Sequence, residues 1–291
     1  MQNMREIKRR IRSVQNTRQI TKAMTMVAAA KLRRAQERAE GSRPYTDKIS
    51  EVIASIAARI GTVDHPLLEV REIKKTGYVV ITSDQGLAGG YNSNLLRQLT
   101  KTIKERHKSM DEIDIFVIGK KGSEYLKRRD YPIVDQVLGL ADNPSFSDIK
   151  KISNRVVKMY AEGVFDEVYL YYNEFVSTIT QIPTEKKLLP LTDIKAGEGV
   201  AAKDLQSYIE FEPSAEEVLG TLLPRYAETL IYSALLNAKA SESGARMTAM
   251  DSATTNADEM IDSLTLTYNR ARQASITQEL TEIVAGANAL S

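Results

Sequence analysis

The last seventy or so residues contain almost nothing that would interrupt a helix. No proline follows Pro224, and the only later glycines are Gly244 and Gly286. Because proline and glycine are the poorest helix formers, this segment is predicted to be one continuous helix. At 1.5 Å per residue it would be roughly 100 Å long, several times the width of a small domain. A helix of that length has nothing in its own segment to pack against, so we expect a second long helix as its partner.

The N-terminal segment offers such a partner. Its first apolar residues follow the three-four spacing of a coiled-coil seam: Met4, Ile7, Ile11 and Val14. The seam is then predicted to change phase and to resume with Ile20, Met24 and Val27. No glycine or proline occurs before Gly41, and we expect Pro44 to kink the helix rather than end it. The two ends of the chain are therefore predicted to form an antiparallel helix pair.

The middle of the chain has the sequence pattern of an α/β domain. Three short β-rich runs stand out at 78–82 (YVVIT), 113–118 (IDIFVI) and 168–172 (VYLYY). The first two are each followed by a turn and a helical pattern, which predicts a mainly parallel sheet covered by helices. Further strands are expected at 133–138, 178–182, 187–191 and 208–211, and a helix near 149–160 with Ser147 as its N-cap.

The long C-terminal helix changes character along its length. Ser214 with Glu217 forms a capping-box pattern, and Pro224 suits the first turn of a fresh helix. Between Ala238 and Ala257 most residues are small, which allows close approach of a second backbone. The final turns carry the apolar stripe Ile276, Leu280, Ile283, Ala287 and Leu290, and no charge follows Glu282. Such an uncharged end is predicted to sit inside a partner.

Composition excludes several classes of protein. The chain has no cysteine, which removes disulfides and thiolate metal sites and fits a cytoplasmic face. No run approaches eighteen apolar residues, and the N-terminus lacks the apolar core of a secretory signal. Residues 1–40 hold eleven Lys or Arg against three Glu, a net charge of +8. This basic arm indicates either an acidic partner (nucleic acid, anionic lipid or protein) or a solvated helix face.

Catalytic patterns are weak. The glycine-rich stretch from Ser83 to Asn92 lies between a predicted strand and a predicted helix, where phosphate loops occur, but it matches neither GxxxxGK[ST] nor GxGxxG. His65 and His107 have no nearby ligand partners in the sequence. We expect no cofactor, no metal site and no enzyme activity in this chain on its own.

Five motifs, spread in order along the whole chain, resemble one family. They are QITKAM (19–24), TSDQGLAGGYNSN (82–94), KASESGARMTAM (239–250), YNRARQ (268–273) and ITQELTEIVAGANA (276–289). On these motifs the chain is similar to the gamma subunit of F-type ATP synthases, in its bacterial form. It departs from the usual pattern in having Thr25 for Glu, Gln85 for Arg and Ala88 for Cys.

The resemblance implies a fold, a role and partners. The fold would be α/β, with a long antiparallel coiled coil of the terminal helices and an inserted Rossmann-like domain. We expect an N-terminal helix at 1–60, the α/β domain at 72–212 and a C-terminal helix at 213–291. The chain would be the rotor shaft that couples ion flow to catalysis. Its partners would be three alpha and three beta subunits, the epsilon subunit and the membrane c-ring, on the cytoplasmic side of the bacterial membrane, with no nucleic acid and no insertion into the bilayer.

The resemblance also implies roles for individual residues. Contacts to the beta subunits would come from Arg9, Lys31, Arg33, Arg34, Arg272, Gln273, Thr277, Glu279 and Glu282. The bearing tip would be Ile283, Val284, Ala287 and Leu290, and Met24 would pack within the shaft. A further contact loop would comprise Asp84, Gln85, Gly86, Gly89 and Gly90.

Two other functions remain as alternatives. The +8 arm would suit a nucleic-acid-associated coiled coil, whose binding should weaken steeply with salt. The glycine loop would suit a nucleotide-binding α/β enzyme, which would require the isolated chain to bind the ligand.

Overall fold

The computed structural model describes residues 4–60, 65–192, 212 and 214–290. They fall into two compact units, one of Met1–Ala28 with Met247–Ser291 and one of Ala29–Arg246. We refer to these as the terminal unit and the sheet unit. The units divide the chain within both long helices, whereas the expected segments divide it at the helix ends.

Two helices account for most of the described chain. Helix α1 spans Met4–Ile60 and helix α6 spans Ala215–Leu290. As expected, α1 continues through Pro44. The expected new start at Pro224 is wrong, because α6 already begins at Ala215 and includes that proline. Its true start is marked by Ser214, whose Oγ accepts a hydrogen bond from the backbone N–H of Glu217 at 3.2 Å. None of the described helices is long and apolar enough to cross a membrane.

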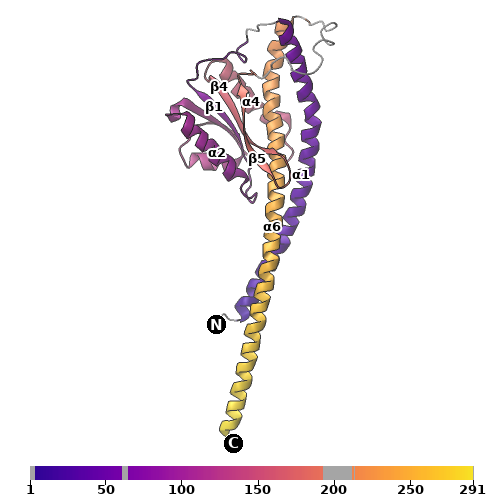
Figure 1. The fold of residues 1–291 in the computed structure, drawn as a ribbon, viewed down its shortest axis with the longest axis vertical. Helices are drawn as coiled ribbons and strands as arrows, with labels where there is room; N and C mark the ends of the chain where they lie inside the picture. The colour runs from indigo at the N-terminus through magenta and orange to yellow at the C-terminus, as the bar shows by residue number, and fades with distance from the viewer. Residues whose placement is uncertain (1–3, 61–64, 193–211, 213, 291) are drawn as a thin grey trace. The chain divides into compact units, whose positions relative to one another are not determined.

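A five-stranded sheet forms the centre of the sheet unit (Figure 1). Its strands are β1 (Thr76–Ile81), β2 (Ile113–Ile118), β3 (Ile133–Val137), β4 (Glu167–Phe175) and β5 (Gln181–Leu189), in the order β3-β2-β1-β4-β5. The first four are parallel, and β5 pairs antiparallel with β4 at the edge. The connections contain α2 (Tyr91–Arg106), η1 (Met110–Glu112), α3 (Lys120–Lys127) and α4 (Phe146–Ala161). The predicted parallel, helix-covered sheet is confirmed.

Alternation along the strands sorts the core into two layers. In β1, Tyr78 and Val80 face a cluster with Leu95 and Leu99 of α2. Their neighbours Val79 and Ile81 face the opposite cluster, which contains side chains of α4, α1 and α6 such as Ile152, Ile53 and Leu223. Because both faces are covered, the central strands β1 and β2 are buried along almost their whole length and are mainly apolar rather than alternating. The sheet thus holds the sheet-unit parts of both long helices against one of its faces.

Two local expectations need correction, and a third is not tested. In place of the separate strands expected at 178–182 and 187–191 there is the single strand β5, which overlaps each of them only in part. The N-cap of α4 is Ser145, not Ser147, because Ser145 and Asp148 complete a capping box. In this box the backbone N–H of Ser145 donates to the Asp148 carboxylate at 2.7 Å, which lowers the pKa of Asp148. The expected strand at 208–211 lies outside the described residues.

The seam of α1 does not change phase. In the terminal unit, the covered positions include 4, 7, 11, 14, 18, 21, 25 and 28, an uninterrupted heptad pattern. Ile20 and Val27, which we expected in the seam, are exposed. The seam at this point contains the polar residues Arg18, Thr21 and Thr25. A search for regularly spaced apolar residues therefore does not find it. Met24 is half-buried beside it.

Candidate functional site

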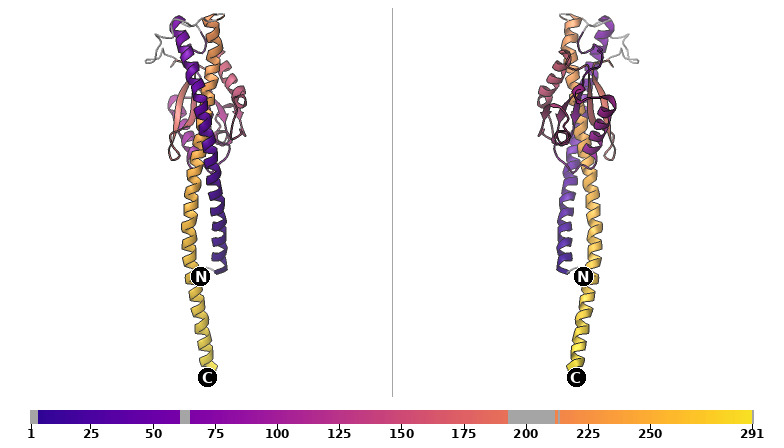
Figure 2. Two further views of the ribbon diagram at one scale, coloured as in Figure 1. Left: turned by 90° about the vertical axis from the view of Figure 1, so that its right-hand side faces the viewer. Right: turned by 90° about the vertical axis from the view of Figure 1, so that its left-hand side faces the viewer.

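The terminal unit is an antiparallel pairing of the first turns of α1 with the second half of α6. Arg18 forms an ion pair with Asp258, and the hydroxyls of Thr21 and Thr254 hydrogen-bond at 2.7 Å. Because the helices are antiparallel, each step back along α1 corresponds to a step forward along α6. This register places Met4 opposite residue 271 or 272. Figure 2 shows the two segments side by side, with α6 continuing past the start of α1.

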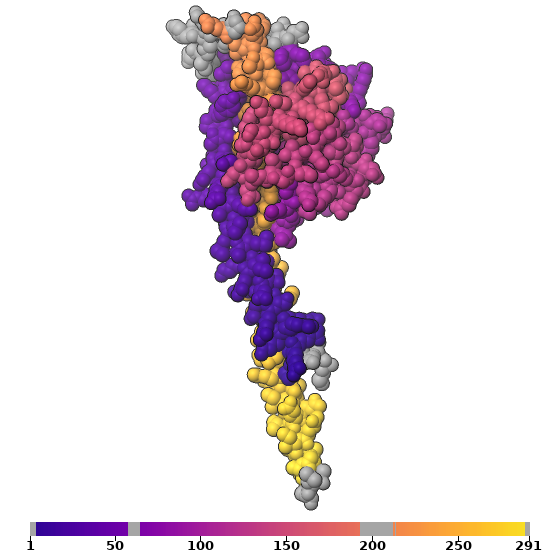
Figure 3. Space-filling model, turned by 180° about the vertical axis from the view of Figure 1, so that it is seen from behind, coloured from indigo at the N-terminus to yellow at the C-terminus, as the bar shows by residue number. Residues whose placement is uncertain are grey.

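Beyond this pairing, α6 is uncovered. Ser275 is the last partly covered position, and every side chain from Ile276 to Asn288 is exposed. On the face seen in Figure 3, these last turns project past α1. Ile283 and Val284, expected in the bearing tip, are 67% and 58% exposed. Ala287 is exposed as well, and the side chain of Leu290 lies outside the described part of the chain.

The polar contact residues expected on α6 lie on this uncovered end or directly before it. The structure exposes all five of them: Arg272, Gln273, Thr277, Glu279 and Glu282. The contacts that Glu279 and Glu282 make with the described residues are local ones within the helix, such as Gln278 Nε2 donating to Glu282 Oε1 at 2.9 Å. The terminal unit therefore brings these residues together with the tip on one continuous, solvent-facing segment.

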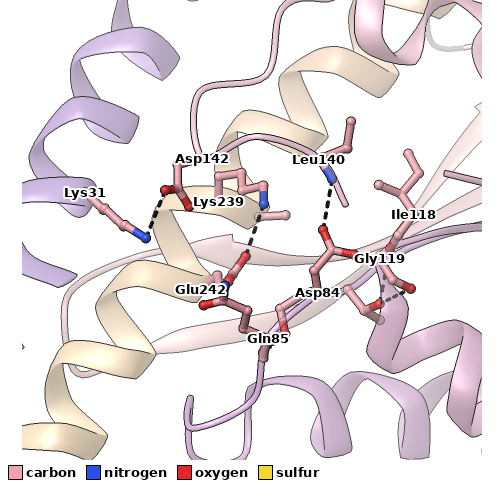
Figure 4. Close-up of polar contacts among 12 residues, drawn as sticks. Lys31, Asp84, Gln85, Ile118, Gly119, Leu140, Asp142, Lys239 and Glu242 are labelled. Carbon is pink, nitrogen blue, oxygen red and sulfur yellow. Dashed lines mark hydrogen bonds and ion pairs between the residues drawn. The ribbon is translucent and has the colours of Figure 1, made fainter. Parts of the chain in front are cut away.

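The basic residues of α1 are placed less uniformly. Arg9 is exposed in the terminal unit, whereas the other three belong to the sheet unit. Arg33 and Arg34 are exposed there, and Arg33 pairs with Glu37 one turn away at 3.1 Å. Lys31 is half-buried, and its Nζ lies 2.9 Å from Asp142 (Figure 4). Lys31 is thus already engaged inside the sheet unit.

The glycine-rich loop from Ser83 to Gly90 is held from within by Asp84. One carboxylate oxygen accepts hydrogen bonds from the backbone N–H groups of Lys120 and Gly139 at 2.9 and 3.0 Å. The other accepts from Leu140 at 3.1 Å (Figure 4). Asp84 therefore joins the loop to the start of α3 and to the turn after β3. Gln85, Gly89 and Gly90 stay exposed, and Gly86 is half-buried.

A buried ion cluster on α6 binds the same loop. Glu242 accepts from Arg246 at 2.8 Å and lies 3.5 Å from Lys239. Arg246 also donates to the backbone carbonyls of Gln85 and Gly86 at 3.3 and 3.2 Å. We had not assigned this cluster a role. Its signal in the sequence is the three-four spacing of opposite charges on one helix face.

Tyr91, at the first turn of α2, adds a third attachment of this region to α6. Its hydroxyl donates to the carbonyl of Ala238 at 2.9 Å, and Asn173 of β4 donates to the Tyr91 carbonyl at 3.1 Å. Burial raises the pKa of Tyr91 far above its usual value, so the hydroxyl stays a donor. The loop thus presents carbonyls to a guanidinium, whereas a phosphate site needs free N–H donors.

Two comparisons identify the family. A family model described as ATP synthase matches residues 3–290. The ATP synthase gamma chain of Brevibacillus brevis is 61% identical over 286 residues, which is 98% of each chain. The chain therefore belongs to the ATP synthase gamma chain family, and as a gamma chain it is a non-catalytic subunit of that complex.

Solved structures agree on the fold. The chain is similar to one in the central stalk and c-ring of the Tetrahymena thermophila mitochondrial ATP synthase, with 28% identity and a TM-score of 0.61 over 80% of this chain and 99% of that one. It is also similar in fold to a chain of the Euglena gracilis mitochondrial enzyme, with 19% identity and a TM-score of 0.67 over 99% and 94% of the two chains.

Proposed function

We propose that this gamma chain is the central rotor shaft of a bacterial ATP synthase. In this role it couples ion flow through a membrane c-ring to ATP synthesis and hydrolysis on the beta subunits. The observation that carries the proposal is the uncovered end of α6, where an unbroken helix leaves its pairing with α1 and exposes every side chain from Ile276 to Asn288. Such a segment needs a surface supplied by other chains.

The partners follow from this assignment. Three alpha and three beta subunits would surround the paired helices, and the epsilon subunit and the c-ring would bind elsewhere on the chain. The complex would lie on the cytoplasmic side of the cell membrane as a peripheral assembly. Residues 1–60 and 213–291 would form the shaft, and 72–212 the domain that connects it to the rotor.

The two parts of the uncovered end suit different tasks. The tip, from Ile283 onward, has no ionisable side chain, so it has no ion pairs to break as it turns against a partner. Arg272, Gln273, Thr277, Glu279 and Glu282 offer charges and hydrogen bonds that could engage the beta subunits at particular angles. Charged groups at the rim of a protein contact orient the partners and favour one arrangement over others. A rotating contact needs an interaction energy that depends on angle in this way.

The basic residues and the glycine loop are proposed as secondary contacts. Arg9, Arg33 and Arg34 are exposed cations that suit an acidic segment of the beta subunits. Lys31 would have to exchange Asp142 for that partner. In the loop, the exposed Gln85, Gly89 and Gly90 are available for contact, whereas Asp84 and the Gly86 carbonyl serve to hold the loop in place.

Reconstitution tests the role of the chain. The purified chain should hydrolyse no ATP, and addition of this chain to alpha and beta subunits should restore turnover. Appreciable ATPase activity in the chain alone would contradict the proposal.

A double substitution tests the polar contacts. Arg272→Ala with Gln273→Ala should lower turnover of the assembled complex, because both side chains are exposed directly before the uncovered end, while assembly itself survives. The matched control is Arg43→Ala with Asp47→Ala, which removes an exposed pair on α1. Equal turnover in the two double variants would show that Arg272 and Gln273 are not the contact.

A further inference from the structure

The sheet unit contains a cavity of about 420 Å³ between α1, α4 and α6. It is separate from the loop and the ion cluster described above, and no part of the rotor proposal uses it. Its volume lies within the range of small-molecule sites in proteins. Three kinds of side chain in its lining point to one kind of ligand.

The first is a largely buried acid whose carboxylate is open to the cavity. Glu228 lines the cavity and is only 8% exposed, and no hydrogen bond or close ion pair joins it to the residues that the structure describes. Burial raises the pKa of Glu228, while Lys150 and Arg225 act in the opposite direction. The carboxylate oxygens are not fully enclosed, so a donor that enters the cavity can reach them.

The second is aromatic surface. The rings of Phe146 and Tyr232 meet edge to face at 5.6 Å, and the Tyr232 hydroxyl donates to the carbonyl of Pro144 at 3.1 Å. Both rings are therefore held in position before any ligand arrives. Tyr45 adds a third ring at the exposed side of the cavity. Preformed aromatic walls favour a flat ring system, which stacks on them at little entropic cost.

The third is positive charge. Lys150 and Arg225 line the same cavity and are exposed, so they are free to meet an anionic group. They also disfavour a cationic occupant such as a basic side chain. Lysine and arginine are the usual partners of phosphate in proteins.

We propose that this cavity binds a guanine nucleotide. An ionised carboxylate only accepts hydrogen bonds, and guanine offers it two adjacent N–H donors on one edge. Adenine presents a donor beside an acceptor there, which suits a protonated carboxyl instead. The ring would stack on Phe146 and Tyr232, Glu228 would accept from the base, and Lys150 and Arg225 would bind the phosphate.

Calorimetric titration of the full chain with guanosine monophosphate tests the proposal. We expect sub-millimolar binding at neutral pH, about tenfold weaker binding of adenosine monophosphate, and no measurable binding of inorganic phosphate. Glu228→Gln should weaken binding of guanosine monophosphate about tenfold or more, since one acceptor oxygen is replaced by a donor. Glu216→Gln, an exposed acid on the same helix, is the matched control and should bind like the unchanged chain.

Several results would overturn the proposal. These are no binding of guanosine monophosphate at about 5 mM, equal binding by Glu228→Gln, tighter binding of adenosine monophosphate, or equal binding of phosphate alone. The melting temperature of Glu228→Gln without ligand shows whether the variant is folded. Phe146→Leu provides a second variant that leaves all charges in place and should also weaken binding. Because the chain is titrated alone, neither outcome depends on its role as a rotor.

Discussion

Two stretches of the same helix meet opposite environments. From Ala240 to Arg246 every residue of α6 is buried, on all sides of the helix. From Ile276 to Asn288 every side chain is exposed, again on all sides. Each stretch carries a single glycine, Gly244 or Gly286, and the exposed one holds the larger apolar side chains, such as Ile276 and Leu280. Hydrophobicity alone would bury the second stretch, so the difference comes from what surrounds the helix in this chain.

The comparison separates internal contacts from external ones. Residues 240–246 are enclosed by β4, the glycine loop and α1, through contacts such as Ser241 Oγ donating to the Asn173 carbonyl at 2.8 Å. Residues 276–288 are not enclosed in this way, because every one of their side chains is exposed. Substitutions in the first stretch should therefore change the stability of the chain, and substitutions in the second should change its assembly with partners.

The largest expected effect comes from a matched pair of isoleucines on α6. Ile231 is fully buried and Ile283 is 67% exposed. Ile231→Ala should cost about 2–5 kcal/mol of unfolding free energy, because it removes buried methylene groups and leaves a cavity. Ile283→Ala should change it by less than about 0.5 kcal/mol. Urea denaturation followed by circular dichroism measures both, and similar losses would mean that the tip is covered within the chain.

A matched pair of glycines gives the next effect. A Cβ at Gly244 would lie 3.2 Å from Cε2 of Phe175, whereas at Gly286 it would meet nothing within 4 Å. Gly244→Leu should destabilise the chain by about 1–3 kcal/mol through overpacking. Gly286→Leu should stabilise the helix by up to about 1 kcal/mol. A Gly244→Leu variant as stable as the unchanged chain would show that α6 can move away from the sheet unit's hairpin.

The threonine pair in the seam should matter less. Thr21→Val and Thr254→Val each remove one hydroxyl of the 2.7 Å hydrogen bond between the helices. A double-mutant cycle should give a coupling of about 0.5–1.5 kcal/mol, because one of the two hydroxyls donates across the seam only by giving up its bond to the Arg18 or Met250 carbonyl of its own helix. Thermal melting of the four proteins measures the coupling. A value of zero would place register control in the Arg18–Asp258 ion pair alone.

The smallest effect is a dependence on pH. Burial raises the folded-state pKa of Glu228, so folding favours the protonated form of this carboxyl. Its contribution to the free energy of unfolding is complete below the unfolded pKa of 4.5 and is lost as pH rises through the folded pKa. Lys150 and Arg225, which face it, reduce this loss. Glu228→Gln should melt at an equal or higher temperature than the unchanged chain at neutral pH, with the difference disappearing at acid pH. A difference that grows toward acid pH would contradict the raised pKa.

Prediction from sequence succeeded where one element's pattern was sufficient. The strands at Tyr78–Ile81 and Ile113–Ile118 were predicted because parallel strands covered on both faces are continuously apolar. It failed for the phase of the α1 seam, because Thr21 was counted as polar surface although Thr254 satisfies its hydroxyl. The ion cluster around Arg246 was missed for a similar reason, since its partners at Gln85 and Gly86 are distant in sequence.

The amino-acid sequence by itself determined that the chain has two long terminal helices, a mainly parallel sheet between them and an uncharged C-terminal end. These properties depend on local propensity and periodicity, which neighbouring residues carry. Only the tertiary structure decided which stretch of α6 is enclosed and which is left uncovered. It also decided that Lys31 and Asp84 are engaged internally, and that Glu228 lines a cavity together with Lys150 and Arg225. Burial and hydrogen-bond partners depend on residues far apart in the chain, so one helix can carry similar residues into opposite environments.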